Sequence, residues 1–289
     1  MKFAVSCCLG ALGFAALVGG CRKQAAPAPG KVTALLVSRL PSAPGDPLWS
    51  RASVYAAKLL LQDLVEPRRL ERTTERLSVR ALTDGRLVAF RLNWDDPTED
   101  SRAAGPSQFA DACAVQFPAR IETTVPAPQM GEAGKPVVIA YWNAAWQRSA
   151  EKKTETLRDY YPNAAVDHYP FEAPSLREGS PERKAMAKRY SPARAVENPV
   201  SGRPARCVQD LLAEGPGTLT IRGEQVSTGS GVRNDGGWSV VIVTPLPKRV
   251  HSSAPLQVAF AVWDGGRGEK GSRKMRTAWI PLALGGIKQ

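Results

Sequence analysis

Histidine is nearly absent from this chain: its 289 residues include only two, His168 and His251. Both stand in stretches that we expect to be loops, where a histidine is more often solvated than catalytic. The sequence also has no Gly-x-Ser-x-Gly nucleophile elbow and no glycine-rich phosphate-binding loop. These absences argue against an enzyme in its own right.

Cysteine is scarce: beyond the N-terminal region the chain has only Cys113 and Cys207. Neither belongs to a Cys-x-x-Cys-His motif, which excludes a covalently attached c-type haem, and their spacing gives no zinc or iron–sulfur site. In an oxidising compartment two cysteines suggest a disulfide. We therefore predict a Cys113–Cys207 bond, with two buried thiols as the alternative.

Long apolar runs are missing except at the N-terminus, where Lys2 precedes a short apolar stretch over residues 3–18. This stretch is typical of a secretory signal rather than a membrane span. Residues 18–21, Val-Gly-Gly-Cys, match a bacterial lipobox, and a Pro/Ala linker follows over residues 22–30. We predict a signal peptide over residues 1–21, lipidation of Cys21 and a periplasmic, membrane-anchored protein. A plain signal peptide cut nearby is the alternative.

The charge is strongly positive, with 39 Lys and Arg against 27 Asp and Glu and a formal net charge of +12. A basic surface can bind nucleic acid, an anionic membrane or an acidic protein. The Lys and Arg residues are scattered and form no continuous run. We therefore expect an acidic protein or a membrane surface as partner, and no nucleic acid.

Short alternating apolar runs, separated by Gly, Pro and Asp turns, fill most of residues 31–289. Alternation with period two predicts strands, and the absence of a βαβ rhythm excludes a parallel sheet. The fold prediction is all-β: a single antiparallel β-sandwich domain with long irregular loops and few short helices. Residues 52–64 fit helix or strand, and we favour strand. The predicted strands lie at 31–39, 77–82, 87–94, 109–117, 136–142, 217–222, 226–232, 238–244, 256–263 and 276–284.

Residues 151–206 interrupt this pattern with mixed charges, many prolines and few apolar runs. We predict a long irregular insertion with one short helix near residues 181–188. Such long loops are usually functional or disordered. This insertion is therefore a candidate docking arm, with a merely solvated loop as the alternative.

Met130 stands on a Pro/Gly-rich turn just before the apolar strand 136–142. A thioether in that place is a plausible soft metal ligand, and a Met that fills a packing gap is the alternative. A second notable stretch, residues 262–282, combines tryptophans with a Gly-rich, Lys-containing turn.

These two stretches, with five others in the same order along the chain, resemble the haem-binding gamma subunits of ethylbenzene dehydrogenase and its relatives in the dimethyl-sulfoxide-reductase group of molybdenum enzymes. The sequence departs from the family pattern at Cys113, where an aliphatic residue is expected, and in its lipobox. The stretches that carry the resemblance are residues 92–97, 111–118, 128–131, 136–142, 211–220, 231–238 and 263–279.

The resemblance implies a fold like that of carbohydrate-binding modules and one non-covalent haem b with a Met and a Lys as axial ligands. By motif position these are Met130 and Lys274; Lys270 and Met275 are the nearby competitors. If a strand has begun by residue 274, Met275 points to the opposite face. Further haem contacts are expected from the side chains of Trp142, Trp263, Trp279 and either Arg273 or Arg276.

The resemblance also implies a function in electron transfer, since two protein ligands on the iron leave no position for a substrate. The expected partners are a molybdopterin subunit and an iron–sulfur subunit on one side and a cytochrome c or quinol system on the other. The alternative is a haem-free carbohydrate-binding or scaffold lipoprotein with the same sandwich.

Overall fold

The computed structural model describes residues 30–102, 107–151, 161–163, 175–196, 206–234, 236–247 and 254–286. The predicted signal peptide, Cys21, both histidines and part of the predicted insertion lie outside the described residues.

The all-β prediction is confirmed, since strands form most of the regular structure in the described part of the chain. The strands are β1 (Val32–Leu36), β2 (Tyr55–Lys58), β3 (Leu60–Leu61), β4 (Arg76–Thr83), β5 (Leu87–Asp95), β6 (Ala112–Pro118), β7 (Val137–Asn143), β8 (Val208–Ala213), β9 (Thr220–Ile221), β10 (Thr228–Asn234), β11 (Gly237–Pro245), β12 (Leu256–Trp263), β13 (Met275–Arg276) and β14 (Ile280–Gly285). The helices are α1 (Ala144–Ala150), α3 (Pro181–Tyr190) and α4 (Pro192–Ala195), with 3-10 turns η1 (Pro47–Arg51) and η3 (Gly265–Arg267).

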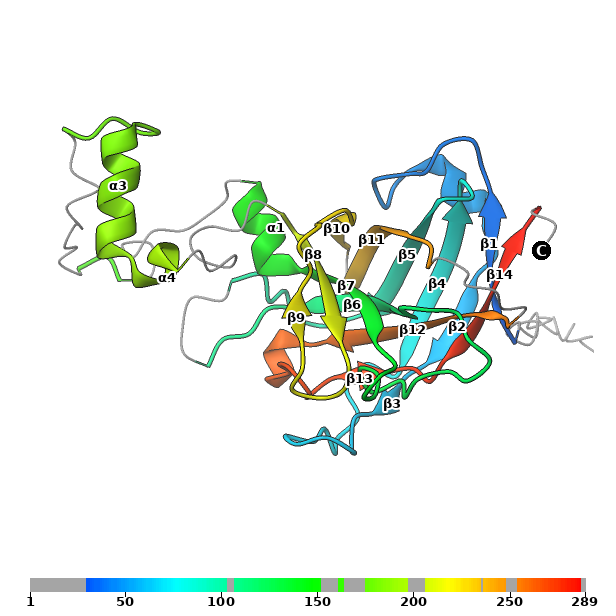
Figure 1. Cartoon of the computed structure of the whole chain (residues 1–289). Coiled ribbons are helices and arrows are strands. Elements are labelled where there is room, and N and C mark those ends of the chain that lie inside the picture. Colours follow the sequence, from blue (N-terminus) through cyan, green and yellow to red (C-terminus); the bar gives the residue numbers. More distant parts are fainter. Residues whose placement is uncertain are drawn as a thin grey trace, which may run out of the picture.

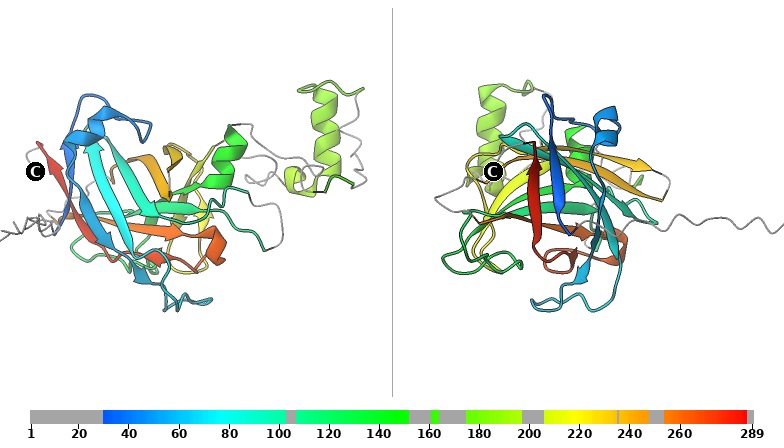
Figure 2. Two further views of the ribbon diagram at one scale, coloured as in Figure 1. Left: turned by 180° about the vertical axis from the view of Figure 1, so that it is seen from behind. Right: turned by 90° about the vertical axis from the view of Figure 1, so that its right-hand side faces the viewer.

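The strands pair in the order β10-β11-β5-β4-β1-β14-β12-β6-β7-β8-β9 and fold into two layers (Figures 1 and 2). Strand β12 joins the layers, because its first residues pair with β14 and its last residues pair with β6. The expectation of purely antiparallel pairing is wrong at one strand. Strand β1 runs parallel to both of its neighbours, β4 and β14.

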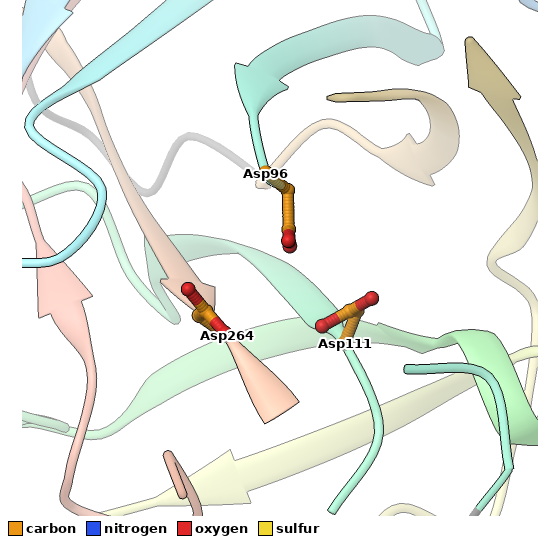
Figure 3. Close-up of side chains that lie close together, drawn as sticks. All are labelled: Asp96, Asp111 and Asp264. Carbon is orange, nitrogen blue, oxygen red and sulfur yellow. The ribbon is translucent and has the colours of Figure 1, made fainter. Parts of the chain in front are cut away.

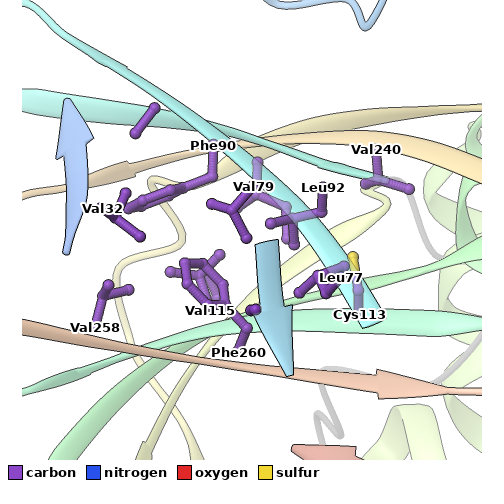
Figure 4. Packing of buried hydrophobic residues seen from close by; sticks show 14 of the residues in the cluster. Val32, Leu77, Val79, Phe90, Leu92, Cys113, Val115, Val240, Val258 and Phe260 are labelled. Atoms are coloured by element: carbon purple, nitrogen blue, oxygen red, sulfur yellow. The ribbon is translucent and has the colours of Figure 1, made fainter. Parts of the chain in front are cut away.

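The main core lies between the two layers and is built from alternate residues of facing strands (Figure 4). Phe90 of β5 meets Phe260 of β12 in an edge-to-face contact with ring centroids 5.4 Å apart. Both rings are buried, and each buried Phe contributes roughly 1.5–3 kcal/mol through removal of apolar area from water. This packing fixes which face of each strand points outward.

The layer of β6, β7, β8 and β12 is apolar on its other face as well. On β7, Trp142 points into the main core, whereas Ile139 and its neighbours on the same face join a second apolar cluster. On β6 and β12, Ala114 and Ala261 belong to that second cluster. An antiparallel layer usually turns one face to water. Two apolar faces indicate that something else covers the outer one.

Strand β8 and helix α1 are among the elements that were not predicted from the sequence. Strand β8 pairs with β7 directly after the insertion, and helix α1 directly follows β7. The side chain of Asn143 caps α1 by accepting hydrogen bonds from the backbone N–H groups of Ala145 and Trp146. The predicted helix near residues 181–188 is confirmed as α3, which with α4 lies to one side of the strand layers (Figure 1).

The predicted disulfide is absent from the structure, where both cysteines are free thiols. Cys113 is buried in the main core on β6, and burial raises the pKa of its thiol. The thiol of Cys207 donates a hydrogen bond to the backbone oxygen of Gly229 at 3.0 Å. The alternative of two buried thiols describes Cys113; Cys207 is partly exposed.

Candidate functional site

A cavity of about 450 Å³ opens over the outer face of the layer formed by β6, β7, β8 and β12. Its floor comes from strand side chains, and its walls come from loops that lie far apart in the sequence. Its volume falls in the range of small-molecule and cofactor sites. The lining residues that matter here are Gln62, Met130, Ile139, Tyr141, Trp146, Leu211, Trp263, Lys274 and Arg276.

Aromatic side chains form the centre of the floor. The ring of Tyr141 meets Trp263 and Trp146 in edge-to-face contacts, with centroids 5.2 and 5.4 Å apart. Burial raises the pKa of Tyr141 to about 12, so its phenol is neutral at physiological pH. The floor therefore supplies flat apolar surface rather than acid–base groups.

Met130 is held in a conformation that side-chain-bearing residues rarely adopt. Its φ of 71° is the one positive value at a non-glycine residue in the described part of the chain. Backbone hydrogen bonds fix this turn: Gly131 donates to Ala127, and Gly215 donates to the Met130 oxygen, both at 2.9 Å. Such strain costs of order 1–3 kcal/mol and concentrates at functional sites. Here it holds the thioether at the cavity wall.

Lys274 brings an amine to the same cavity. Its ammonium nitrogen lies 5.0 Å from the ring centre of Trp263. Burial, with a smaller effect from the nearby charge of Arg276, lowers the pKa of Lys274 to about 8. The amine is therefore far easier to deprotonate than an ordinary lysine, as a metal ligand must be.

The two competitors of Lys274 lie elsewhere. Met275 is fully buried in the main core, on the opposite face, as strand alternation predicted. Lys270 is exposed, and its ammonium lies over the ring of Phe109 at 5.0 Å. Of these residues only Lys274 lines the cavity.

Two polar side chains of the cavity wall have buried atoms without a hydrogen bond. These are the Nε of Arg276 and the Oε1 of Gln62. Burial lowers the pKa of Arg276, while Asp63 partly offsets this effect. A buried polar atom left unpaired costs about 1–3 kcal/mol. Arg276 is therefore the cavity's candidate for pairing with a ligand carboxylate.

Three of the predicted haem contacts do not line the cavity. The indole of Trp142 points into the main core, where its Nε1 donates to Gln147 at 2.9 Å. Trp279 packs beside the second apolar cluster and donates to the backbone oxygen of Pro126, but it does not line the cavity. Arg273 is exposed. Of the two arginines considered, Arg276 lines the cavity.

The residues that the sequence interpretation missed carry a signal that could have found them. In the strand Val137–Asn143, residues 137, 139 and 141 share one face, and 138, 140 and 142 share the other. Ile139 packs in the same cluster as Met130, so its face of the strand is the cavity side. Tyr141 shares that face, whereas Trp142 lies on the opposite one. Gln62 could not be found in this way, because it lies far along the sequence from the other lining residues. Trp146 lies close to Tyr141 in sequence, but helix α1, which positions it, was not predicted.

The cavity suits a flat apolar group that carries a metal and carboxylates. Its floor is aromatic and aliphatic, a thioether and an amine of lowered pKa supply soft and neutral ligands, and an arginine has an unpaired buried donor. Haem combines these features. Fold and site together define a cofactor-binding β-sandwich.

Known proteins agree with this class. A model of the ethylbenzene dehydrogenase family matches residues 46–275. A predicted respiratory nitrate reductase heme subunit of Haloferax mediterranei is 25% identical over 88% of this chain and 72% of its own length. The chlorate reductase subunit gamma of Ideonella dechloratans is 23% identical over 72% of this chain and 65% of its own length.

The chain therefore belongs to the ethylbenzene dehydrogenase family and to its haem-binding gamma subunits, as the seven sequence stretches indicated. Membership of this family fits an electron-transfer subunit rather than a catalytic one.

Solved structures similar to this chain include a family 9 carbohydrate-binding module of Caldicellulosiruptor kristjanssonii in complex with cellotriose. It is 8% identical, with 89% of this chain and 97% of the module covered and a TM-score of 0.41. A carbohydrate-binding protein of Bacteroides uniformis is 9% identical with a TM-score of 0.38 and covers 89% of this chain and 94% of its own.

Replacing Lys274 by Met tests the energetic cost of the buried amine. We expect Lys274→Met to stabilise the cofactor-free protein by about 1–2 kcal/mol at pH 7, because the folded state disfavours the charged amine. Below pH about 8 the lysine is charged in both the folded and the unfolded protein, so the full cost of burying the charge opposes folding. This cost declines as the pH rises toward the ordinary pKa of 10.5. The gain should therefore fall to about a quarter of its pH 7 value at pH 10.

Denaturant unfolding of both proteins at pH 7 and pH 10 measures this difference. Lys270→Met is the matched control, and its exposed position predicts a change within about 0.5 kcal/mol. If Lys274→Met lowers the free energy of unfolding by the same amount at both pH values, burial of the charged amine does not destabilise the folded protein.

Proposed function

We propose that this chain binds one haem b non-covalently, with Met130 and Lys274 as the axial ligands, and transfers electrons within an exported molybdenum oxidoreductase. The observation that carries the proposal is the shared cavity, to which both side chains contribute over an apolar floor. The absence of Cys-x-x-Cys-His from the sequence supports type b.

When bound, haem supplies a one-electron iron couple, and the residues of this chain set the conditions for it. The neutral thioether of Met130 favours the ferrous form and raises the potential. Lys274 serves as a ligand only as a free amine, for which its low pKa already prepares it. Arg276 is placed to pair with a propionate. If Met130 and Lys274 both bound the iron, the site would be suited to electron transfer and not to binding substrate.

The partners proposed for this chain follow from its relatives, which carry the names of nitrate and chlorate reductase subunits. We assign it a molybdopterin subunit and an iron–sulfur subunit on one side and a cytochrome c or quinol system on the other. The net charge of +12 suits an acidic surface on one of them, because complementary charge speeds encounter and sets orientation.

The location that fits this function is the periplasm, with a lipid anchor on Cys21. The signal-like N-terminus and the lipobox support it. Among the residues that the structure describes, no helix has the length and hydropathy needed to cross a membrane.

Spectroscopy of the purified protein tests the haem proposal. We expect acid acetone to extract the pigment, its pyridine adduct to show b-type bands, and Lys274→Ala and Met130→Ala to lose the low-spin spectrum or the haem. Lys270→Ala should leave the spectrum unchanged, since that amine lies outside the cavity. Failure to bind haem after supplementation would favour the haem-free carbohydrate-binding or scaffold protein instead. If Lys270→Ala loses the low-spin spectrum and Lys274→Ala keeps it, the lysine ligand is Lys270, one turn before Lys274.

Replacing Cys21 tests the anchor. We expect Cys21→Ala to abolish lipid labelling and to release the protein from the membrane fraction, because the lipidated thiol is then missing. Incorporation of labelled palmitate and fractionation of cells provide the measurement. A variant that stays in the membrane fraction as the unaltered protein does would contradict the lipid anchor.

Gentle purification of a tagged chain tests the partners. At low ionic strength we expect the molybdopterin and iron–sulfur subunits to co-purify, and rising salt should remove them because it screens the charge complementarity of a basic protein. Mass spectrometry of the eluted complex identifies the subunits. A chain recovered alone at low salt, with a haem that no such complex reduces, would be a free-standing electron carrier.

A further inference from the structure

Three buried aspartates converge where β5 and β12 end and β6 begins (Figure 3). Asp96 directly follows β5, Asp111 directly precedes β6, and Asp264 directly follows β12. Each offers one carboxylate oxygen within 4.8 Å of those of the other two. Their exposed fractions are 1%, 0% and 4%, so water screens their charges poorly.

The surrounding protein does not neutralise this charge. The nearest cationic contacts are both 3.9 Å long: Arg233 to Asp96, and the largely exposed Arg267 to Asp264. Burial raises the pKa of all three carboxyls, and that of Asp111 reaches about 7. Repulsion by Asp264 further raises the pKa of Asp96, whereas Thr98, Arg233 and the nearby Trp94 favour its ionised form. Three carboxylates in this arrangement need an additional positive charge.

Hydrogen bonds fix the direction of each carboxylate and leave oxygen lone pairs free. Asp111 accepts from the backbone N–H groups of Gly265 and Asp100, at 2.9 and 2.8 Å, and from the indole of Trp238 at 2.9 Å. Asp264 accepts from the backbone N–H of Arg267 with one oxygen.

Asp96 supplies a second, independent sign of a ligand. Its Oδ1 accepts a hydrogen bond from the backbone N–H of Thr98 at 3.1 Å, but its Oδ2 is buried and has no hydrogen-bond partner. The side chain points toward the other two aspartates (Figure 3). An unpaired carboxylate oxygen inside a protein is costly unless a cation or donor satisfies it.

We propose that Asp96, Asp111 and Asp264 bind one calcium ion. Oxygen is the only ligand atom that the three side chains offer, and hard cations prefer it. Oxygens bound to Ca²⁺ at about 2.3–2.6 Å lie up to about 5 Å apart, which accommodates the observed 4.8 Å limit. Mg²⁺ usually keeps several waters and gives them up reluctantly, so three buried carboxylates suit it less well.

The ion would act as a structural clip. Strand β5 belongs to one layer, β6 to the other, and β12 joins them. A single cation bound by residues at the ends of all three would hold both layers together at this end. None of the three aspartates lines the cavity, so an ion bound to them would not contact the haem.

Calcium binding to the full chain is measured after treatment with a chelator. Equilibrium dialysis with elemental analysis should find one Ca²⁺ per chain, and the midpoint of thermal unfolding should rise with Ca²⁺ concentration, because the ion binds only the folded state. Mg²⁺ at equal concentration should raise it less. A chelated chain that takes up no Ca²⁺ and unfolds at the same temperature with and without it would overturn the proposal, and preference for Mg²⁺ would overturn the assignment of calcium.

Matched variants locate the site. Asp96→Asn and Asp264→Asn should each weaken Ca²⁺ binding at least about tenfold. In chelator, Asp96→Asn should be no less stable than the unaltered chain, because it relieves carboxylate repulsion. Asp95→Asn, at the exposed neighbouring residue, should bind Ca²⁺ normally. The haem spectrum of each variant reports whether it folds. Normal Ca²⁺ affinity in both Asp96→Asn and Asp264→Asn would place the ion elsewhere.

Discussion

The layer of β6, β7, β8 and β12 is apolar on both faces, and the rest of the molecule is arranged around this constraint. One face packs against the opposite layer and forms the main core. The outer face must also be shielded from water, and loops from distant parts of the chain cover it around the cavity. Small side chains such as Ala114 and Ala261 on this outer face leave room there, while Tyr141 and Trp263 provide flat contact surface. Binding of an apolar cofactor thus completes the burial that folding alone leaves unfinished.

The cost of the site is concentrated in the residues that make it useful. Met130 has a strained backbone, Lys274 has an amine disfavoured in its charged form, and Arg276 has an unpaired buried donor. Each is destabilising in the cofactor-free chain. A group that offers a metal and a carboxylate would relieve the cost at Lys274 and Arg276 and would offset the backbone strain at Met130. Natural proteins break local rules mainly at functional sites, where the surrounding structure holds the strained groups in place.

The sequence predicts well what depends on local pattern and poorly what depends on pairing across the chain. Alternation located most of the strands and placed Met275 opposite Lys274, because side chains alternate faces within a strand. The parallel pairing of β1 with β4 and β14 has no local signal. Strand β8 was hidden by the Pro-rich insertion that precedes it.

The site shows the same division between local and long-range information. Motif position brought Met130, Lys274 and Trp263 to one cavity, but the choice of Trp142 ignored the face on which it lies. The aspartate cluster was missed for another reason. Asp96 sits in a stretch expected to be a turn, and turn aspartates usually bond the backbone. Only the packing of β5 against β6 and β12 across the two layers brings Asp264 to it.

The segment that follows β12 connects the aspartate cluster to the cavity. It begins at Asp264, whose side chain caps the turn η3, and its next buried residue with a charge is Glu269. Glu269 accepts a hydrogen bond from the backbone N–H of Asp264 at 2.9 Å and pairs with Arg69 at 3.2 Å. The indole of Trp263 then donates to the backbone oxygen of Gly271, three residues before Lys274.

These contacts tie the segment down at both ends, so the position of Lys274 depends on where Asp264 is held. A ligand lysine is useful only if its amine stays at one place and one depth in the cavity, since a small displacement changes both its distance to a metal and its exposure to water. The charge balance around Asp264 is therefore a condition for the geometry of the cavity, although no carboxylate of the cluster lines it.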